Sequence, residues 1–184
     1  GSDAFTVPQY ELTHYASYPR RINAKPFNLT VYRFAEGSMD EGAFRLDVGG
    51  ADDLQAIRFH GKERWGKEAT TFRWTRDRSY FTVTKVNPSD RELIVRMGSG
   101  GRPAKVAPPQ VAIFLGGRVI GKVQVEGHFR DYVFPIPPEL AAQLARQGTS
   151  SEVRIESTTW TPRDVLGVAD DRQLGVMIDQ AEIR

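Results

Sequence analysis

The sequence contains no cysteine, and its three histidines, His14, His60 and His128, lie far apart along the chain. Disulfide frameworks, thiolate zinc sites and cysteine catalysis are therefore excluded. Because the histidines show no HExxH or comparable spacing, a zinc hydrolase is not expected. A chain of 184 residues is long enough to bury a core without disulfides or a structural metal.

Long apolar runs and an excess of one charge are also missing. The longest uncharged apolar stretch, VAPPQVAIFLGG at residues 106–117, is far shorter than the roughly 18 residues of a membrane span. The 25 basic and 23 acidic residues are distributed together and give a net charge of only +2. We therefore expect no membrane span in this sequence and no nucleic-acid partner. The opening Gly1-Ser2 is typical of the scar of an expression tag, so a natural leader or membrane helix would lie outside this sequence.

Signatures of common enzymes are absent as well. There is no GxSxG elbow, and GSGG at residues 98–101 is followed by neither a Walker-type lysine nor a helix. We interpret residues 98–109 as a loop between strands. Glycoside hydrolysis needs only two carboxylates about 5 to 10 Å apart, and the sequence singles out no such pair. We therefore expect a chain without catalytic activity, and keep a small glycoside hydrolase as a third alternative.

Short strand-like runs make up most of the sequence and recur every 8 to 15 residues between turns rich in Gly, Pro and Asp. This pattern is typical of a sandwich or barrel. Alternation places apolar residues on one face of several runs, namely Leu93, Val95 and Met97, then Val119, Val123 and Val125, then Val153 and Ile155. QVAIFL at residues 110–115 is apolar on both faces, which predicts a central strand, and Gly116-Gly117 predicts a two-residue hairpin. Residues 70–75 and 79–84 are predicted as two separate strands.

One helix is predicted, in PPELAAQLARQG at residues 137–148. Pro138 and Glu139 suit a first helical turn, Leu140 and Leu144 stack one turn apart, and Gly148 supplies the stop. We expect this helix to cap one end of a sandwich formed by residues 43–184. Residues 1–42 combine the tag scar with an extended, irregular N-terminal arm that we expect to pack on the domain.

The densest group of aromatic and charged residues lies between Asp47 and Arg78. Sugars are bound by aromatic faces and by charged or amide side chains that hydrogen-bond their hydroxyl groups. Trp65, in the charged stretch KERWGKE, is the candidate platform, and the alternative is a loop anchor tucked under the sandwich edge. Trp74 and Trp160 are expected to pack inside. The other candidate ligand contacts are Arg73, Glu63, His60 and Arg64.

Several motifs between residues 43 and 184 resemble a soluble β-sandwich domain of bacterial polytopic membrane proteins. They are LDVGGADDLQAIRFHGKERWGKEATTFRWTRDRSYFTV, ELIVRM, DYVFPIP, VRIESTTWTPRD and DDRQLGVMIDQAEI. Many such proteins look like glycosyltransferases that use lipid-linked sugars. This sequence departs from the family's small-residue turn at RFHGKE, and residues 1–42 match no part of it. The resemblance implies an exported accessory domain, periplasmic or at the cell surface, that is anchored to a membrane-embedded partner.

The final strand, MIDQAEI at residues 177–183, is similar to the last strand of jelly-roll carbohydrate-binding modules. In several of those modules an aspartate at this place ligates a structural calcium ion beside an early acidic residue. The resemblance carries that role to Asp179, with Asp47 or another early acid as its partner. From the pattern alone, the apolar phase switches at Asp179, as at a bulge, an edge or a strand buried on both sides. Its carboxylate could bind a cation, pair with an arginine or face solvent.

Together these features predict a jelly-roll β-sandwich of two antiparallel sheets with one short helix. We expect a non-catalytic, carbohydrate-binding-like accessory domain whose partners are a polysaccharide or other glycan and its own membrane region. Structural calcium is the one cofactor that the resemblance suggests. The main alternative is a structural docking module without sugar binding.

Overall fold

A computed structural model describes residues 12–22, 25–34, 44–50, 52–66 and 70–184. The chain divides into two compact units, residues 1–42 and residues 43–184. In the first unit, β1 (Leu12–Ile22) pairs antiparallel with β2 (Lys25–Phe34). The sequence predicted an irregular arm here, whereas the structure has a regular strand pair. The proposed packing of residues 1–42 on the sandwich stays a prediction.

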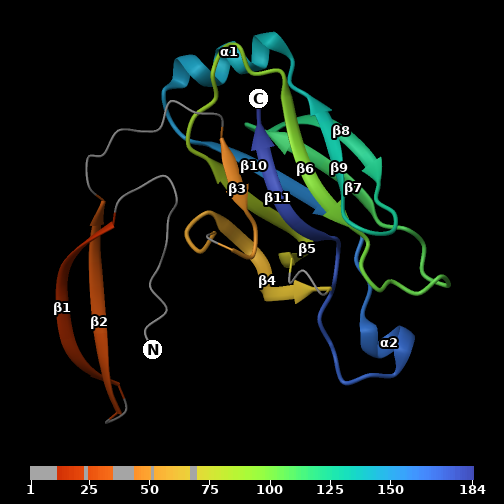
Figure 1. Ribbon diagram of the computed structural model, residues 1–184, viewed down its shortest axis with the longest axis horizontal. Helices are drawn as coiled ribbons and strands as arrows, with labels where there is room; N and C mark the ends of the chain where they lie inside the picture. Colours follow the sequence, from red (N-terminus) through yellow and green to blue (C-terminus); the bar gives the residue numbers. More distant parts are fainter. Residues whose placement is uncertain (1–11, 23–24, 35–43, 51, 67–69) are drawn as a thin grey trace. The chain divides into compact units, whose positions relative to one another are not determined.

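The second unit is an antiparallel jelly-roll sandwich, as the sequence predicted (Figure 1). Its strands are β3 (Arg45–Asp47), β4 (Ala56–Trp65), β5 (Thr70–Val83), β6 (Glu92–Gly98), β7 (Gln110–Leu115), β8 (Arg118–Gln124), β9 (Arg130–Pro135), β10 (Ser151–Ser157) and β11 (Met177–Ile183). Hydrogen bonds join all nine strands in the order β8-β7-β10-β5-β11-β6-β9, with β3 paired to β11 and β4 to β5. We call β8-β7-β10-β5 the first sheet of the sandwich, and β11, β6 and β9 with β3 the second. Strand β4 pairs along β5.

Strand β5 belongs to both sheets. Its residues 78–83 pair with β10, whereas Arg73 and Trp74 pair with β11. The prediction of two separate strands at 70–75 and 79–84 was therefore wrong. Residues 76–78 are polar and exposed where the strand passes between the sheets, and this interrupts the apolar pattern without ending the strand.

The core lies between the two sheets and confirms most of the predicted alternation. The inward side chains of β6 and β10 are completely buried and belong to one cluster, namely Leu93, Val95, Met97, Val153 and Ile155. Each such burial contributes about 1.5–3 kcal/mol relative to exposure. The inner face of the sandwich therefore supplies the main driving force for this fold.

The hairpin at Gly116-Gly117 is confirmed, with φ angles of 55° and 82° that match a type I′ turn. Val119, however, is exposed, although the sequence placed it on the same face as Val123 and the buried Val125. The register between β7 and β8 shifts next to Phe114, and this bulge turns Val119 to the outer face.

Helix α1 (Pro138–Gln147) is confirmed, and it lies across one end of the sandwich (Figure 1). Leu140 and Leu144 join the core cluster, and Gly148 ends the helix in the left-handed conformation. A second helix, α2 (Pro162–Leu166), was not predicted, because five residues are too few to show a helical period. No helix in the described part of the chain is long and apolar enough to span a bilayer.

Candidate ligand-binding site

The loop between β3 and β4 folds back onto β5 beside Arg73, one of the predicted binding residues. Gly49 has a φ of +90° and lies so close to the backbone of Phe72 that a Cβ atom would come within 2.5 Å of it. Its N–H donates to Asp52 Oδ2 at 2.8 Å. Only glycine fits this approach, so the GG pair in the sequence marks where the loop is pressed against the strand.

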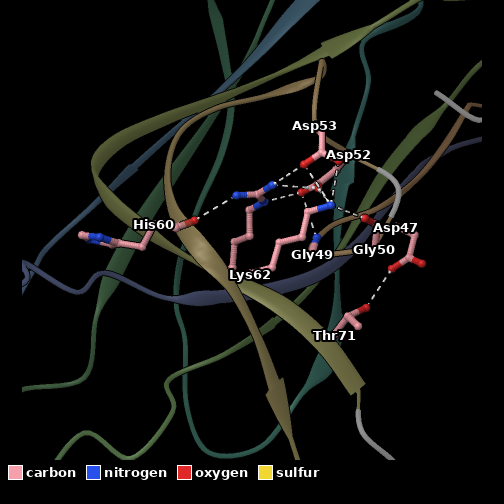
Figure 2. Close-up of polar contacts among 9 residues, drawn as sticks. Asp47, Gly49, Gly50, Asp52, Asp53, His60, Lys62 and Thr71 are labelled. Atoms are coloured by element: carbon pink, nitrogen blue, oxygen red, sulfur yellow. Dashed lines mark hydrogen bonds and ion pairs between the residues drawn. The ribbon is translucent and has the colours of Figure 1, made fainter. Parts of the chain in front are cut away.

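Arg73 holds this loop in place from β5. It donates to Asp52 through Nε at 2.6 Å and Nη2 at 3.0 Å, and to the backbone oxygen of His60 through Nη1 at 3.1 Å. Asp53 accepts from the same guanidinium at 3.1 Å. Figure 2 shows Asp52, Asp53 and Lys62 converging, with the Lys62 ammonium 2.9 Å from Asp53. These four bonds use four of the five N–H donors of Arg73, so the ligand contact predicted from the sequence would have one N–H of Nη1 left.

His60 and Glu63 tie β4 to the segment before β11. His60 is buried and its Nε2 lies 2.9 Å from the backbone oxygen of Gln173, and burial lowers the pKa of His60 below 6.5. Arg172 donates to Glu63 at 2.6 Å and to both oxygens of Asp170, and its bonds to Asp170 lower the pKa of Asp170 to about 2. These predicted ligand contacts thus have internal partners as well.

Trp65 differs from the other two tryptophans. It stands at the last position of β4, paired with Thr70, and is 41% exposed, whereas Trp74 and Trp160 are 5% and 8% exposed. Trp74 and Trp160 share a buried cluster, as the sequence predicted. Arg64, next to Trp65, is also exposed. Among the five predicted contacts, Trp65 and Arg64 are exposed, but as consecutive residues of β4 they point to opposite sides of the strand.

Asp179 lies at a β-bulge, because the register of β11 against β6 shifts between Ile178 and Gln180. The interruption of the apolar pattern is thus a bulge. The backbone oxygen of Asp179 accepts from the N–H of Val48 at 2.7 Å, and its Oδ2 accepts from Arg96 Nε at 2.9 Å. Burial raises the pKa of Asp179, and the nearby guanidinium opposes that shift.

The surroundings of Asp179 favour this ion pair over calcium. Calcium takes six to eight oxygen ligands, whereas Arg96 already places a cation on the carboxylate. Asp47 accepts a hydrogen bond from Thr71 at 3.3 Å. Among the residues that the structure describes, no three His, Asp or Glu side chains form a group that could hold a metal ion. Calcium binding at Asp179 and Asp47 stays a prediction for experiment.

Sequence reasoning missed an open hollow of about 390 Å³ on the outer face of the first sheet. The only signal for it was QVAIFL, whose Ala112 and Phe114 point outward and are half-buried. This strand is internal to its sheet, as predicted, but its second apolar face forms part of the surface. The side chains around the hollow include Arg78, Gln110, Ala112, Lys122, Glu156 and Thr158.

No protein-family profile matches this sequence, and no curated protein sequence matches it. Among solved structures, the chain is similar to a family 35 carbohydrate binding module from Clostridium thermocellum, with 11% identity, a TM-score of 0.46, and coverage of 76% of this chain and 97% of that one. An acetyl xylan esterase from the rumen bacterium Butyrivibrio proteoclasticus has 10% identity and a TM-score of 0.41, and the similarity covers 77% of this chain but only 33% of the esterase. The ANXUR2 extracellular domain from Arabidopsis thaliana has 12% identity and a TM-score of 0.42, with coverage of 77% and 48%. Similarities at this level carry no argument about function, which must come from the residues.

Proposed function

We propose that this chain is a non-catalytic carbohydrate-binding domain in which Trp65 is the aromatic platform. The observation that carries the proposal is the exposure of Trp65, 41% against 5% and 8% for the two other tryptophans. An indole offers a flat apolar face to the C–H groups of a sugar, and its N–H can bond a hydroxyl group. An exposed indole between charged residues is otherwise hard to explain by packing.

The strand that carries Trp65 is fixed from two directions, which supports the proposal. Arg73 binds the backbone oxygen of His60, and Arg172 binds Glu63 two positions before Trp65. A rigid platform loses little conformational entropy when a ligand binds, so more of the contact energy appears as affinity. In this proposal the internally bonded residues hold β4 in place, and Trp65 contacts the sugar.

The pairing of the nearby carboxylates supports a role without catalysis. Asp52, Glu63 and Asp170 each accept charged hydrogen bonds from an arginine. A glycosidase acid needs a carboxyl group whose pKa is raised, whereas the arginine bonds lower the pKa of Asp170 to about 2. From the resemblance noted above, we further propose that the domain is exported and belongs to a membrane-anchored glycosyltransferase.

The test is retention of the 184-residue chain in native gels that contain soluble polysaccharides. We expect Trp65→Ala to weaken retention at least tenfold, equivalent to about 1.4 kcal/mol, with an unchanged melting temperature. Val133→Ala, a matched truncation of an exposed side chain on β9, should behave as wild type. Retention of Trp65→Ala equal to wild type would exclude the platform. A large drop in its melting temperature would identify Trp65 as a structural anchor, which favours the docking alternative.

A further inference from the structure

The register of four strands places Lys122, Ala112, Glu156 and Arg78 in one straight row across the outer face of the first sheet. Lys122 is opposite Ala112, Ala112 opposite Glu156, and Glu156 opposite Arg78. Neighbouring strands are about 4.8 Å apart, so the row spans roughly 14 Å. Ala112 is the one short side chain among long ones, and the hollow of about 390 Å³ lies over it.

The neighbouring row of side chains is more apolar than the row that contains Ala112. Val119, Phe114, Arg154 and Tyr80 are opposite one another in turn across the same four strands. The guanidinium of Arg154 lies over the ring of Phe114 at 3.9 Å from its centroid, and Val119 is exposed. A polar hollow thus runs beside a stacked, largely apolar strip. Sugars present the same combination, with hydroxyl groups at the ring edge and C–H groups on the ring faces.

The four charged side chains that line the hollow balance, and Arg154 of the neighbouring row pairs with Glu156 as well, at 3.3 Å. Arg78 and Lys122 are positive, Asp77 and Glu156 are negative, and Arg78 Nε lies 3.2 Å from Glu156 Oε1. A charged ligand would therefore gain little net attraction. A neutral ligand rich in hydroxyl groups can use both signs, because each hydroxyl both donates and accepts hydrogen bonds. The balance of charge selects for a neutral ligand.

Several hydrogen-bonding groups at the edges of the hollow are available to a ligand. Gln110 Nε2 donates to Gln124 Oε1 at 2.9 Å, which orients the amide of Gln110 and leaves its carbonyl oxygen toward other donors. Within the described part of the chain, the Lys122 ammonium has no hydrogen-bond or ion-pair partner. Lys122 supplies up to three donors, and Thr158, exposed at the same hollow, accepts from the backbone N–H of Gln110 at 3.0 Å and keeps its own O–H as a donor.

We propose that this hollow is a second carbohydrate site, which binds a neutral oligosaccharide laid across β8, β7, β10 and β5. The inference rests on the proposed function and deepens it, because it names the ligand as uncharged and adds a contact surface separate from Trp65. Ala112 forms the floor of this site, and its hydroxyl-binding residues are Gln110, Lys122 and Glu156. The neighbouring row that contains Phe114 contacts the faces of the sugar rings.

The experiment is isothermal titration of the whole chain with neutral gluco-, manno-, galacto- and xylo-oligosaccharides, and with polygalacturonate as the anionic probe. Ala112→Leu fills the hollow without adding a hydrogen-bonding group or a ring, and Gln110→Ala removes a polar contact without filling it. Val133→Leu adds bulk at an exposed position on the outer face of the second sheet and serves as the control. Melting temperatures confirm that each variant is folded.

We expect Ala112→Leu to weaken binding of a neutral oligosaccharide at least tenfold and Gln110→Ala about threefold, while Val133→Leu binds as wild type. Binding should change less than twofold between 50 and 500 mM NaCl, because screening acts on net charges. Wild-type affinity in Ala112→Leu would overturn the inference, and if Trp65→Ala then abolishes binding, the proposed function itself still holds. Binding of polygalacturonate alone would also overturn it. A wild-type chain that binds none of the probes would overturn both.

Discussion

The ion pair between Asp52 and Arg73 gives the sharpest prediction about which of the predicted residues are structural. The side chain of Asp52 is 0% exposed and that of Arg73 only 14% exposed. Asp52→Ala removes the acceptor for two guanidinium bonds, at 2.6 and 3.0 Å, and for the N–H of Gly49 at 2.8 Å. The guanidinium would then be left partly buried with fewer partners.

The size of the effect follows from these contacts. Breaking a buried pair by removing one partner costs about 3–5 kcal/mol, and the remaining bonds of Arg73 to Asp53 and to the backbone of His60 keep the loss toward the lower end. We expect Asp52→Ala to lower the free energy of unfolding by about 3 kcal/mol, which corresponds to roughly 6–12 °C in melting temperature. Urea unfolding followed by tryptophan fluorescence measures the free energy of unfolding, and thermal unfolding measures the melting temperature.

Two variants control the interpretation. Asp53→Ala removes a neighbouring carboxylate that is 31% exposed, and should cost less than about 1 kcal/mol, because exposed pairs contribute little. Asp52→Ala combined with Arg73→Met removes both charges and should recover part of the loss. A cost below 1 kcal/mol for Asp52→Ala would refute the structural role of this pair and return Arg73 to the candidate ligand contacts.

Three further predictions address pH, calcium and packing. Burial lowers the pKa of His60, so as the pH falls the unfolded chain takes up a proton at this residue before the folded chain does. The free energy of unfolding should therefore decrease as the pH drops below about 6.5. His60→Gln should reduce this pH dependence between pH 7 and 5, whereas His128→Gln, at an exposed position, should not. EDTA should leave the melting temperature unchanged if Asp179 is held by its ion pair, and a decrease of several degrees would establish calcium. Gly100 has a φ of +64°, and a Cβ atom there would lie 2.1 Å from the indole of Trp74. Gly100→Ala should therefore lower the free energy of unfolding by about 2 kcal/mol. Gly101→Ala, with nothing within 4 Å, should stay within about 0.5 kcal/mol, and equal costs for both glycines would contradict this packing.

The fold could be predicted from the sequence where one periodic pattern decides the outcome. Leu93, Val95 and Met97 alternate without interruption and all face the core, and the glycine pair after β7 forms the expected hairpin. Patterns fail where one residue shifts the register. The bulge beside Phe114 turns Val119 outward, and neither Val119 nor the residues next to it in the sequence predict this bulge.

The site was harder to predict because its partners are distant in sequence. Glu63 is bonded by Arg172, and His60 by the backbone of Gln173, more than 100 residues away. A cluster of charges in the sequence does not say which charges are already paired. The sequence left two alternatives open for Trp65, an exposed platform and a loop anchor tucked under the sandwich edge, and only the structure shows that its side chain is 41% exposed.

The most direct test of carbohydrate binding is a glycan-array screen of the purified 184-residue chain and its Trp65→Ala variant, each with and without calcium. We predict reproducible, calcium-independent binding of wild type to at least one neutral glycan, with at least one such glycan lost in Trp65→Ala and any glycan bound only at the hollow over Ala112 retained. A blank array for wild type at high protein concentration would contradict it and favour a docking domain without sugar binding.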